Sequence, residues 1–145
     1  MKANELKVTD IMVGDWVICY HPRRLKCFGK VSVGLLHTMQ EQEYGHIKED
    51  SPLFRIVEPI PITKELLEKN GFEREELELP HNYYSGIGDR VILNDNRDYM
   101  NSNNKWSVHV DDEDYCTIAS CELTYLHELQ QLLNLCKIDF EWRVN

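Results

Sequence analysis

The segment TYLHELQQLLNL, from Thr124 to Leu135, is the most regular stretch of the chain and decides the expected fold. Four of its five leucines, at positions 126, 129, 132 and 133, recur with Cys136 at spacings of three, three, one and three, and polar residues fall between them. Apolar residues at this spacing form the stripe of an amphipathic helix that packs one face against a sheet. We therefore predict a helix that Thr124 caps and whose stripe belongs to the core rather than to a catalytic site.

A second helix is predicted within PITKELLEKNGF, which begins at Pro61. Thr63 is a suitable N-cap, and Gly71 suits the left-handed position that ends a helix. Leu67 and Phe72 then stand where a Schellman closure places an apolar contact. The local sequence thus predicts both ends of this short helix.

Short strands are predicted over the first sixty residues. Gly14 and Asp15 provide turn chemistry, and Pro22 interrupts strand pairing. The predicted strands are rich in β-formers or alternate between apolar and polar residues, and they are WVICY (16–20), CFGKVSVGLLHTM (27–39) and LFRIVE (53–58). Several short strands with tight turns indicate a small antiparallel barrel of the SH3-like kind.

The second half of the chain predicts further antiparallel strands. They are YYSGIGDRVILND (83–95) as one strand bulged at Gly86 or Gly88, WSVHVDD (106–112), YCTIASCEL (115–123) after a turn through DDED (111–114), and an edge strand in DFEWRVN (139–145). Residues 73–82 read as a charged linker and 96–105 as an exposed connection.

The predicted fold is α+β. An N-terminal SH3-like small β-barrel lobe, residues 1–62, is followed by antiparallel strands packed against two short helices in residues 63–145. The two parts are either separate lobes or one continuous domain, since 145 residues suit both.

Composition favours a cytoplasmic protein. Five cysteines, an odd number, occur without an export signal at the start, which indicates reduced thiols. No apolar run is long enough to span a bilayer, so no membrane partner is expected. The net charge of −9 is uneven, because residues 1–40 carry six basic and three acidic residues. An acidic chain binds nucleic acid poorly, so such binding would have to use a local basic patch.

The best candidate for such a patch is the loop over residues 21–30. Basic and aromatic side chains gather there, namely Arg23, Arg24, Lys26, Lys30, Trp16 and Tyr20. Cations mixed with aromatics on a small barrel suit single-stranded nucleic acid. The alternative is a solvated loop whose aromatic rings face inward.

Other chemistry has weaker support. The cysteines lack the short paired spacing of zinc knuckles, and no glycine-rich phosphate loop or EF-hand pattern occurs. No metal or cofactor is therefore predicted, and DDED reads as a solvated hairpin turn. Cys27 is the only cysteine beside several basic residues, so a small enzyme that depends on cysteine and histidine or on a metal stays as a third hypothesis.

Three blocks of the chain resemble an uncharacterised family of small proteins from Bacteroides-group gut bacteria, their prophages and other mobile elements. The blocks are MKANELKVTDIMVGDWV (1–17), EPIPITKELLEKNGF (58–72) and TYLHELQQLLNL (124–135). Two departures are Ile62 in place of the usual leucine and CKIDF (136–140) in place of the usual TG segment. The family has no established activity, so the resemblance implies an accessory gene product and no particular chemistry.

The expected function is a non-enzymatic interaction module, an accessory protein of a phage or mobile element that binds a host or phage protein. The acidic second part is suited to covering a basic surface of that partner. Weak nucleic-acid binding through residues 21–30 is the alternative, and the small enzyme is the third. The oligomeric state stays open.

Overall fold

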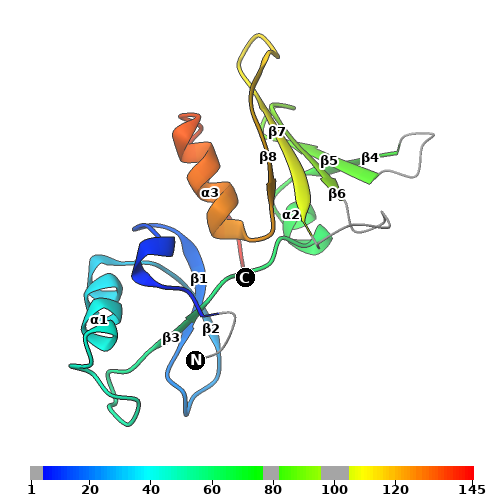
Figure 1. The fold of residues 1–145 in the computed structure, drawn as a ribbon. Helices are drawn as coiled ribbons and strands as arrows, with labels where there is room; N and C mark the ends of the chain where they lie inside the picture. Colours follow the sequence, from blue (N-terminus) through cyan, green and yellow to red (C-terminus); the bar gives the residue numbers. More distant parts are fainter. Residues whose placement is uncertain (1–4, 77–81, 96–104) are drawn as a thin grey trace. The chain divides into compact units, whose positions relative to one another are not determined.

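The computed structural model describes residues 5–76, 82–95 and 105–145 (Figure 1). Within these ranges the chain forms two antiparallel sheets and three α-helices, which confirms the α+β class. It divides after Ile60 into unit 1, Met1–Ile60, and unit 2, Pro61–Val144. No helix in the described ranges is long and apolar enough to cross a bilayer.

Unit 1 is a three-stranded sheet with one long helix. The strand order is β2-β1-β3, and both pairs are antiparallel. The elements are a 3-10 turn at Val8–Asp10, β1 Trp16–Tyr20, β2 Cys27–Lys30, α1 Val33–Glu43 and β3 Ile56–Glu58.

The core of unit 1 lies on one face of this sheet. Val17, Val31, Met39 and Val57 are buried together there. The side-chain amide of Gln42 on α1 holds the chain before β3 in place, since it donates to the Arg55 carbonyl (2.9 Å) and accepts from the Arg55 N–H (2.7 Å). Apolar packing thus joins α1 to the sheet. The Gln42 amide adds the two backbone hydrogen bonds that a neighbouring strand would otherwise make.

The predicted strand over residues 27–39 is wrong beyond Lys30. Ser32 accepts a hydrogen bond from the Leu35 N–H (3.1 Å) and so caps α1, which begins at Val33. The alternation of apolar residues around Val33 happens to fit a strand, but Leu35, Leu36 and Met39 pack together as one helical face. The described residues of unit 1 form no closed barrel, so the SH3-like lobe is not confirmed.

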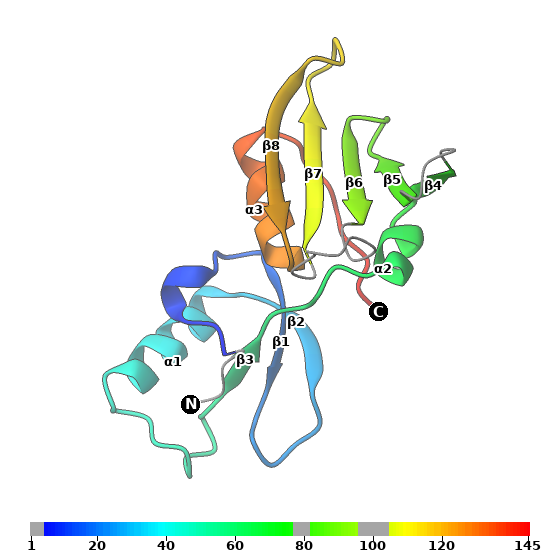
Figure 2. The same cartoon turned by 45° about the vertical axis from the view of Figure 1, so that its right-hand side comes forward.

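Unit 2 is a five-stranded antiparallel sheet in the order β4-β5-β6-β7-β8 (Figure 2). The elements are α2 Lys64–Lys69, β4 Glu73–Glu76, β5 Asn82–Gly86, β6 Val91–Asp95, β7 Trp106–Asp111, β8 Thr117–Leu123 and α3 Leu126–Leu135. In both cartoon views α3 lies beside β8 (Figures 1 and 2).

The predicted leucine stripe is confirmed as core. Leu126, Leu129 and Leu133 of α3 are all buried, as are Trp106 and Val108 on the alternating positions of β7. The hairpin through residues 112–116 that joins β7 to β8 is confirmed as well. Burying several large apolar side chains at about 1.5–3 kcal/mol each makes this layer the main source of stability in unit 2.

The Schellman closure of α2 is also present. The Phe72 N–H donates to the Leu67 carbonyl (3.0 Å), and the Gly71 N–H donates to the Glu68 carbonyl (3.1 Å). Gly71 has φ +82°, the left-handed conformation that a side chain disfavours. Thr63 caps the other end by accepting from the Leu66 N–H (3.1 Å).

Two strand predictions in unit 2 need correction. Residues 83–95 are a hairpin rather than one bulged strand, because Ile87, Gly88 and Asp89 all take positive φ and reverse the chain. Residues 73–76 of the predicted linker pair with β5 as an edge strand. Apart from Lys105, the predicted connection over 96–105 lies outside the described residues.

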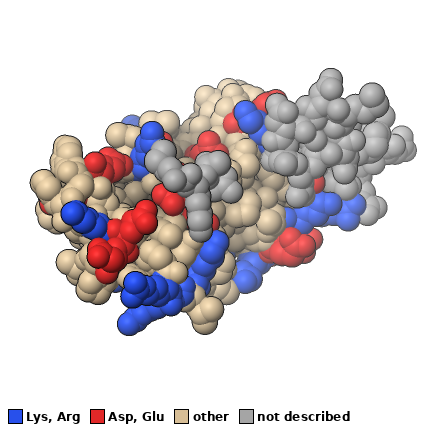
Figure 3. Space-filling view, turned by 60° about the horizontal axis from the view of Figure 1, so that its bottom comes forward, with Lys and Arg blue, Asp and Glu red and all other residues tan. Residues whose placement is uncertain are grey.

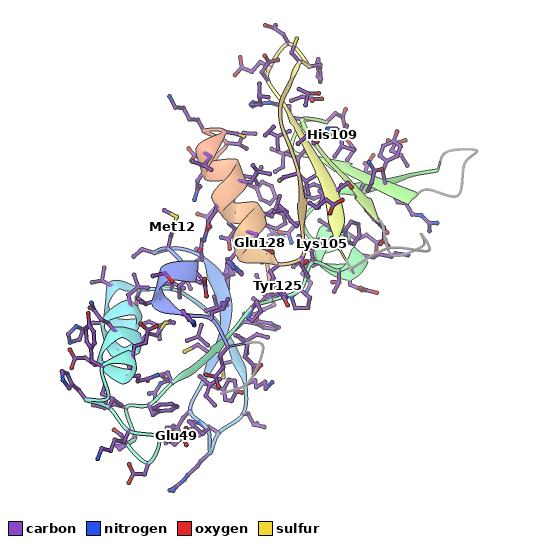
Figure 4. All side chains as sticks on the ribbon, in the orientation of Figure 1. Met12, Glu49, Lys105, His109, Tyr125 and Glu128 are labelled. Atoms are coloured by element: carbon purple, nitrogen blue, oxygen red, sulfur yellow. The ribbon has the colours of Figure 1, made fainter. Side chains whose placement is uncertain are left out.

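Two further predictions are wrong, namely Thr124 as the N-cap of α3 and an edge strand over residues 139–145. Tyr125, not Thr124, occupies the N-cap position, and the Glu128 carboxylate accepts from both backbone N–H groups (3.0 and 3.1 Å; Figure 4 labels Tyr125 and Glu128). The segment 139–145 forms no strand. Instead Trp142 stacks on Phe72, with ring centroids 5.8 Å apart, so the tail is held by aromatic packing.

Replacing Gly71 by alanine should lower the free energy of unfolding by about 1–2 kcal/mol, because a Cβ disfavours the left-handed conformation. Gly71→Asn should lose less, since asparagine adopts that conformation more readily. Urea unfolding of the two variants and the wild type measures both differences. An alanine variant as stable as the wild type would contradict the closure.

Candidate interaction surface

The β1–β2 hairpin carries all six residues that the sequence singles out. In its register Trp16 lies opposite Lys30 and Ile18 opposite Phe28. Directly opposed residues share a face, so Trp16, Ile18, Phe28 and Lys30 lie on the face that points away from Val17 and the core. These four residues are apart in the sequence, and the pairing of β1 with β2 brings them together on one surface.

Tyr20, Lys26 and Glu58 form one cluster at the turn end of this hairpin. The Tyr20 hydroxyl donates to Glu58 Oε1 (2.6 Å), and Lys26 Nζ lies 2.8 Å from the same oxygen and 5.2 Å from the centre of the Tyr20 ring. Glu58 comes from β3, opposite Ile18. The cluster neutralises Lys26 and covers the ring of Tyr20, which is buried.

The Glu58 carboxylate raises the pKa of both side chains that it contacts. Its hydrogen bond raises the pKa of the Tyr20 phenol, because the protonated hydroxyl is the donor, and burial adds to the shift. The same carboxylate raises the pKa of the exposed Lys26 ammonium by favouring its charged form. Both shifts keep the cluster intact at neutral pH.

The remaining cations lie at the tip and on the outer strand. Arg23 and Arg24 are exposed in a turn in which the Arg24 N–H donates to the His21 carbonyl (2.9 Å). Lys30 Nζ lies 5.5 Å from the ring centre of Trp16, close enough for a cation–π contact. Leu25, directly after the two arginines, is 88% exposed.

Sequence reasoning missed two features that alter the interpretation of this surface. Glu58 is 32 positions from Lys26, so only the pairing of β1 with β3 brings the carboxylate to the cation. The second feature is Leu25, which lies in the same segment as the cations and is exposed. A large apolar residue between two basic ones was a signal available from the sequence.

Charge is divided unevenly between the two units. Unit 1 has eight basic and eight acidic residues, whereas residues 61–145 have eight basic and 17 acidic residues. On the face shown in Figure 3, blue side chains stand in small groups beside red ones and form no continuous basic area. The hairpin is therefore a local cationic site on a neutral unit.

Unit 1 also has a pocket of about 1070 Å³. It is lined by the α1 C-terminal end, the loop that includes Glu49 (labelled in Figure 4) and β3. Two of its charged residues are engaged in the wall, since Arg55 donates to the Pro52 carbonyl (2.8 Å) and Glu43 accepts from the Val8 N–H (3.1 Å). Acidic and basic residues line it equally, so its chemistry selects no ligand class.

The residues considered for other chemistry stay apart or have structural roles. Within residues 5–76, 82–95 and 105–145, no three histidine, cysteine or acidic side chains converge as a metal site. Asp112 accepts from the N–H groups of Asp114 and Cys116 (both 2.9 Å), so the acidic turn uses this carboxylate to hold its own backbone. The Cys27 thiol contacts the Leu25 carbonyl (3.6 Å).

His109 lies on β7, between Ile92 of β6 and Ser120 of β8 (Figure 4). Its Nδ1 atom is buried and has no hydrogen-bond partner among the described residues.

Comparisons with protein-family models, with curated proteins and with solved structures find no match to this chain.

Glu58→Gln should lower the pKa of Tyr20 toward its ordinary value of about 10. The raised pKa also means that the contact stabilises the fold below that value and is lost as the pH rises through the folded-state pKa. Alkaline absorbance titration measures this, with Tyr20→Phe subtracted to isolate one of the seven tyrosines. Glu113→Gln, in the exposed β7–β8 turn, is the control and should leave Tyr20 unchanged.

Proposed function

We propose that the protein is a non-enzymatic interaction module that binds a partner protein through the tip of the β1–β2 hairpin. The observation that carries the proposal is Leu25, which is 88% exposed between Arg24 and Lys26. A leucine that is largely exposed at a hairpin tip leaves its apolar surface in contact with water and contributes nothing to the fold. A partner pocket that removes this side chain from water would recover that free energy.

Arginine beside an apolar anchor is a common composition for the energetic centre of a protein interface. Arg23 and Arg24 flank the anchor on one side, and Phe28 on the same hairpin is half exposed. The partner surface that fits this tip is an apolar pocket with acidic residues at its rim.

Nucleic acid fits the same surface less well. Lys26 is paired with Glu58 at 2.8 Å, so a phosphate would have to compete with this carboxylate for one of the four cations. Tyr20 is buried beneath Lys26, and Lys30 lies over the Trp16 ring, so both aromatic faces already have a cation against them. Base stacking requires open ring faces, and affinity requires several unpaired cations.

Origin and compartment are part of the proposal. The resemblance of the three sequence blocks supports an accessory protein of a phage or mobile element in Bacteroides-group gut bacteria, acting on a host or phage protein. The five cysteines are all free thiols, which supports the cytoplasm as the compartment.

The test is a quantitative capture with tagged wild-type protein and tagged variants from a lysate of such a bacterium. A specific partner should be retained by the wild type after nuclease treatment. It should be lost with Leu25→Ser and with the Arg23→Ala/Arg24→Ala double variant. With the partner then purified, each variant should bind at least about tenfold more weakly, the loss typical of interface anchors.

Leu135→Ser is the matched control, because Leu135 is 81% exposed but belongs to unit 2. Both serine variants should unfold within about 0.5 kcal/mol of the wild type, since neither side chain packs in the core. Equal loss of binding in both serine variants would refute the hairpin as the site. A captured component that disappears with nuclease and at high salt would favour the nucleic-acid hypothesis instead.

A further inference from the structure

Two of the five cysteines lie directly opposite each other at the closed end of the hairpin. Cys19 of β1 and Cys27 of β2 are register partners. Opposed residues of an antiparallel pair have Cα atoms about 4.5–5.5 Å apart. This range lies inside the separation of about 4.4–6.8 Å that disulfides require.

The two thiols also lie on the same face and differ in access. Opposed side chains project from the same side of the sheet, so the two thiols share one face, where the Cys27 thiol also contacts the Leu25 carbonyl (3.6 Å). Cys27 is exposed, whereas Cys19 is half-buried and packs against the core of unit 1. An oxidant therefore reaches Cys27 first and leaves Cys19 beside it as the resolving thiol.

We propose that Cys19 and Cys27 are a reversible redox-modification site that closes a disulfide across β1 and β2. The pair is a property of the strand register and does not depend on the proposed partner protein. The co-reactant is a small disulfide such as glutathione disulfide.

The reaction is two successive thiol–disulfide exchanges. The Cys27 thiolate, after loss of its proton, attacks one sulfur of glutathione disulfide, so a mixed disulfide forms and a glutathione thiolate leaves and takes up a proton. The Cys19 thiolate then attacks the Cys27 sulfur and displaces the second glutathione. Two protein thiols are oxidised, one glutathione disulfide is reduced to two glutathione molecules, and one protein S–S bond forms.

The surroundings favour a reversible bond over a permanent one. Burial raises the pKa of the Cys19 thiol, while the nearby Arg55 guanidinium acts against the shift. A disulfide with one exposed sulfur is open to attack by reducing thiols, and exposed disulfides are the labile ones. The bridge closes only the short segment 20–26, so it fixes the hairpin tip rather than the fold.

The site is tested with the full chain in glutathione buffers of graded oxidised-to-reduced ratio. Free thiols are alkylated, and the protein is digested with trypsin without reduction. Arg23, Arg24 and Lys26 lie between the two cysteines, so the bridge joins the peptide ending at Arg23 to the peptide Cys27–Lys30. This joined species should increase with the proportion of glutathione disulfide and disappear with excess dithiothreitol.

Cys27→Ser should abolish the joined species, and Cys116→Ser, which removes an exposed cysteine in unit 2, should leave it unchanged. Three results would overturn the proposal. One is Cys27 capped by glutathione while Cys19 stays free at every ratio. Another is a joined species that forms only in urea. The third is a bridge between Cys121 and Cys136, in β8 and at the end of α3, with Cys19 and Cys27 still reduced.

Discussion

The hydrogen bond from the Trp106 indole to the Ile62 carbonyl (3.0 Å) is the constraint on which unit 2 depends. Trp106 is 1% exposed in β7, and the ring of Tyr84 meets it edge-on at a centroid distance of 5.9 Å. The Ile62 N–H in turn donates to the Thr124 carbonyl (3.0 Å). Both backbone groups of one residue are thus satisfied in the interior, which fixes the starts of α2 and α3 beside the central strands.

In unit 1 a side chain, rather than a strand, satisfies both backbone groups of one residue. Gln42 supplies the donor and acceptor that the Arg55 backbone would otherwise find in a neighbouring strand. The chain entering β3 is thereby held, and β3 brings Glu58 to Tyr20 and Lys26. β3 carries the carboxylate that pairs with Lys26, so this backbone anchor helps to position the countercharge of the candidate surface.

The contacts made in the fold change the function that the basic and aromatic residues of the candidate surface indicate. Counted along the chain, four cations and two aromatics keep nucleic acid as the alternative to a protein partner. In the fold, Glu58 neutralises Lys26 and a cation covers each aromatic ring, so exposed Leu25 with Arg23 and Arg24 becomes the more distinctive feature. Whether a charged side chain is paired and whether an apolar one is exposed depend on neighbours that can be remote in sequence.

The sequence by itself determined the α+β class, both ends of α2, the leucine stripe of α3 and the β7–β8 hairpin. Each depends on interactions within a few residues, such as the Thr63 cap and the left-handed Gly71. Only the tertiary structure decided that residues 73–76 join a sheet, that Glu58 reaches Lys26 and that Cys19 lies opposite Cys27. Such features depend on strand pairing and shared burial, which bring distant residues together and override local preference.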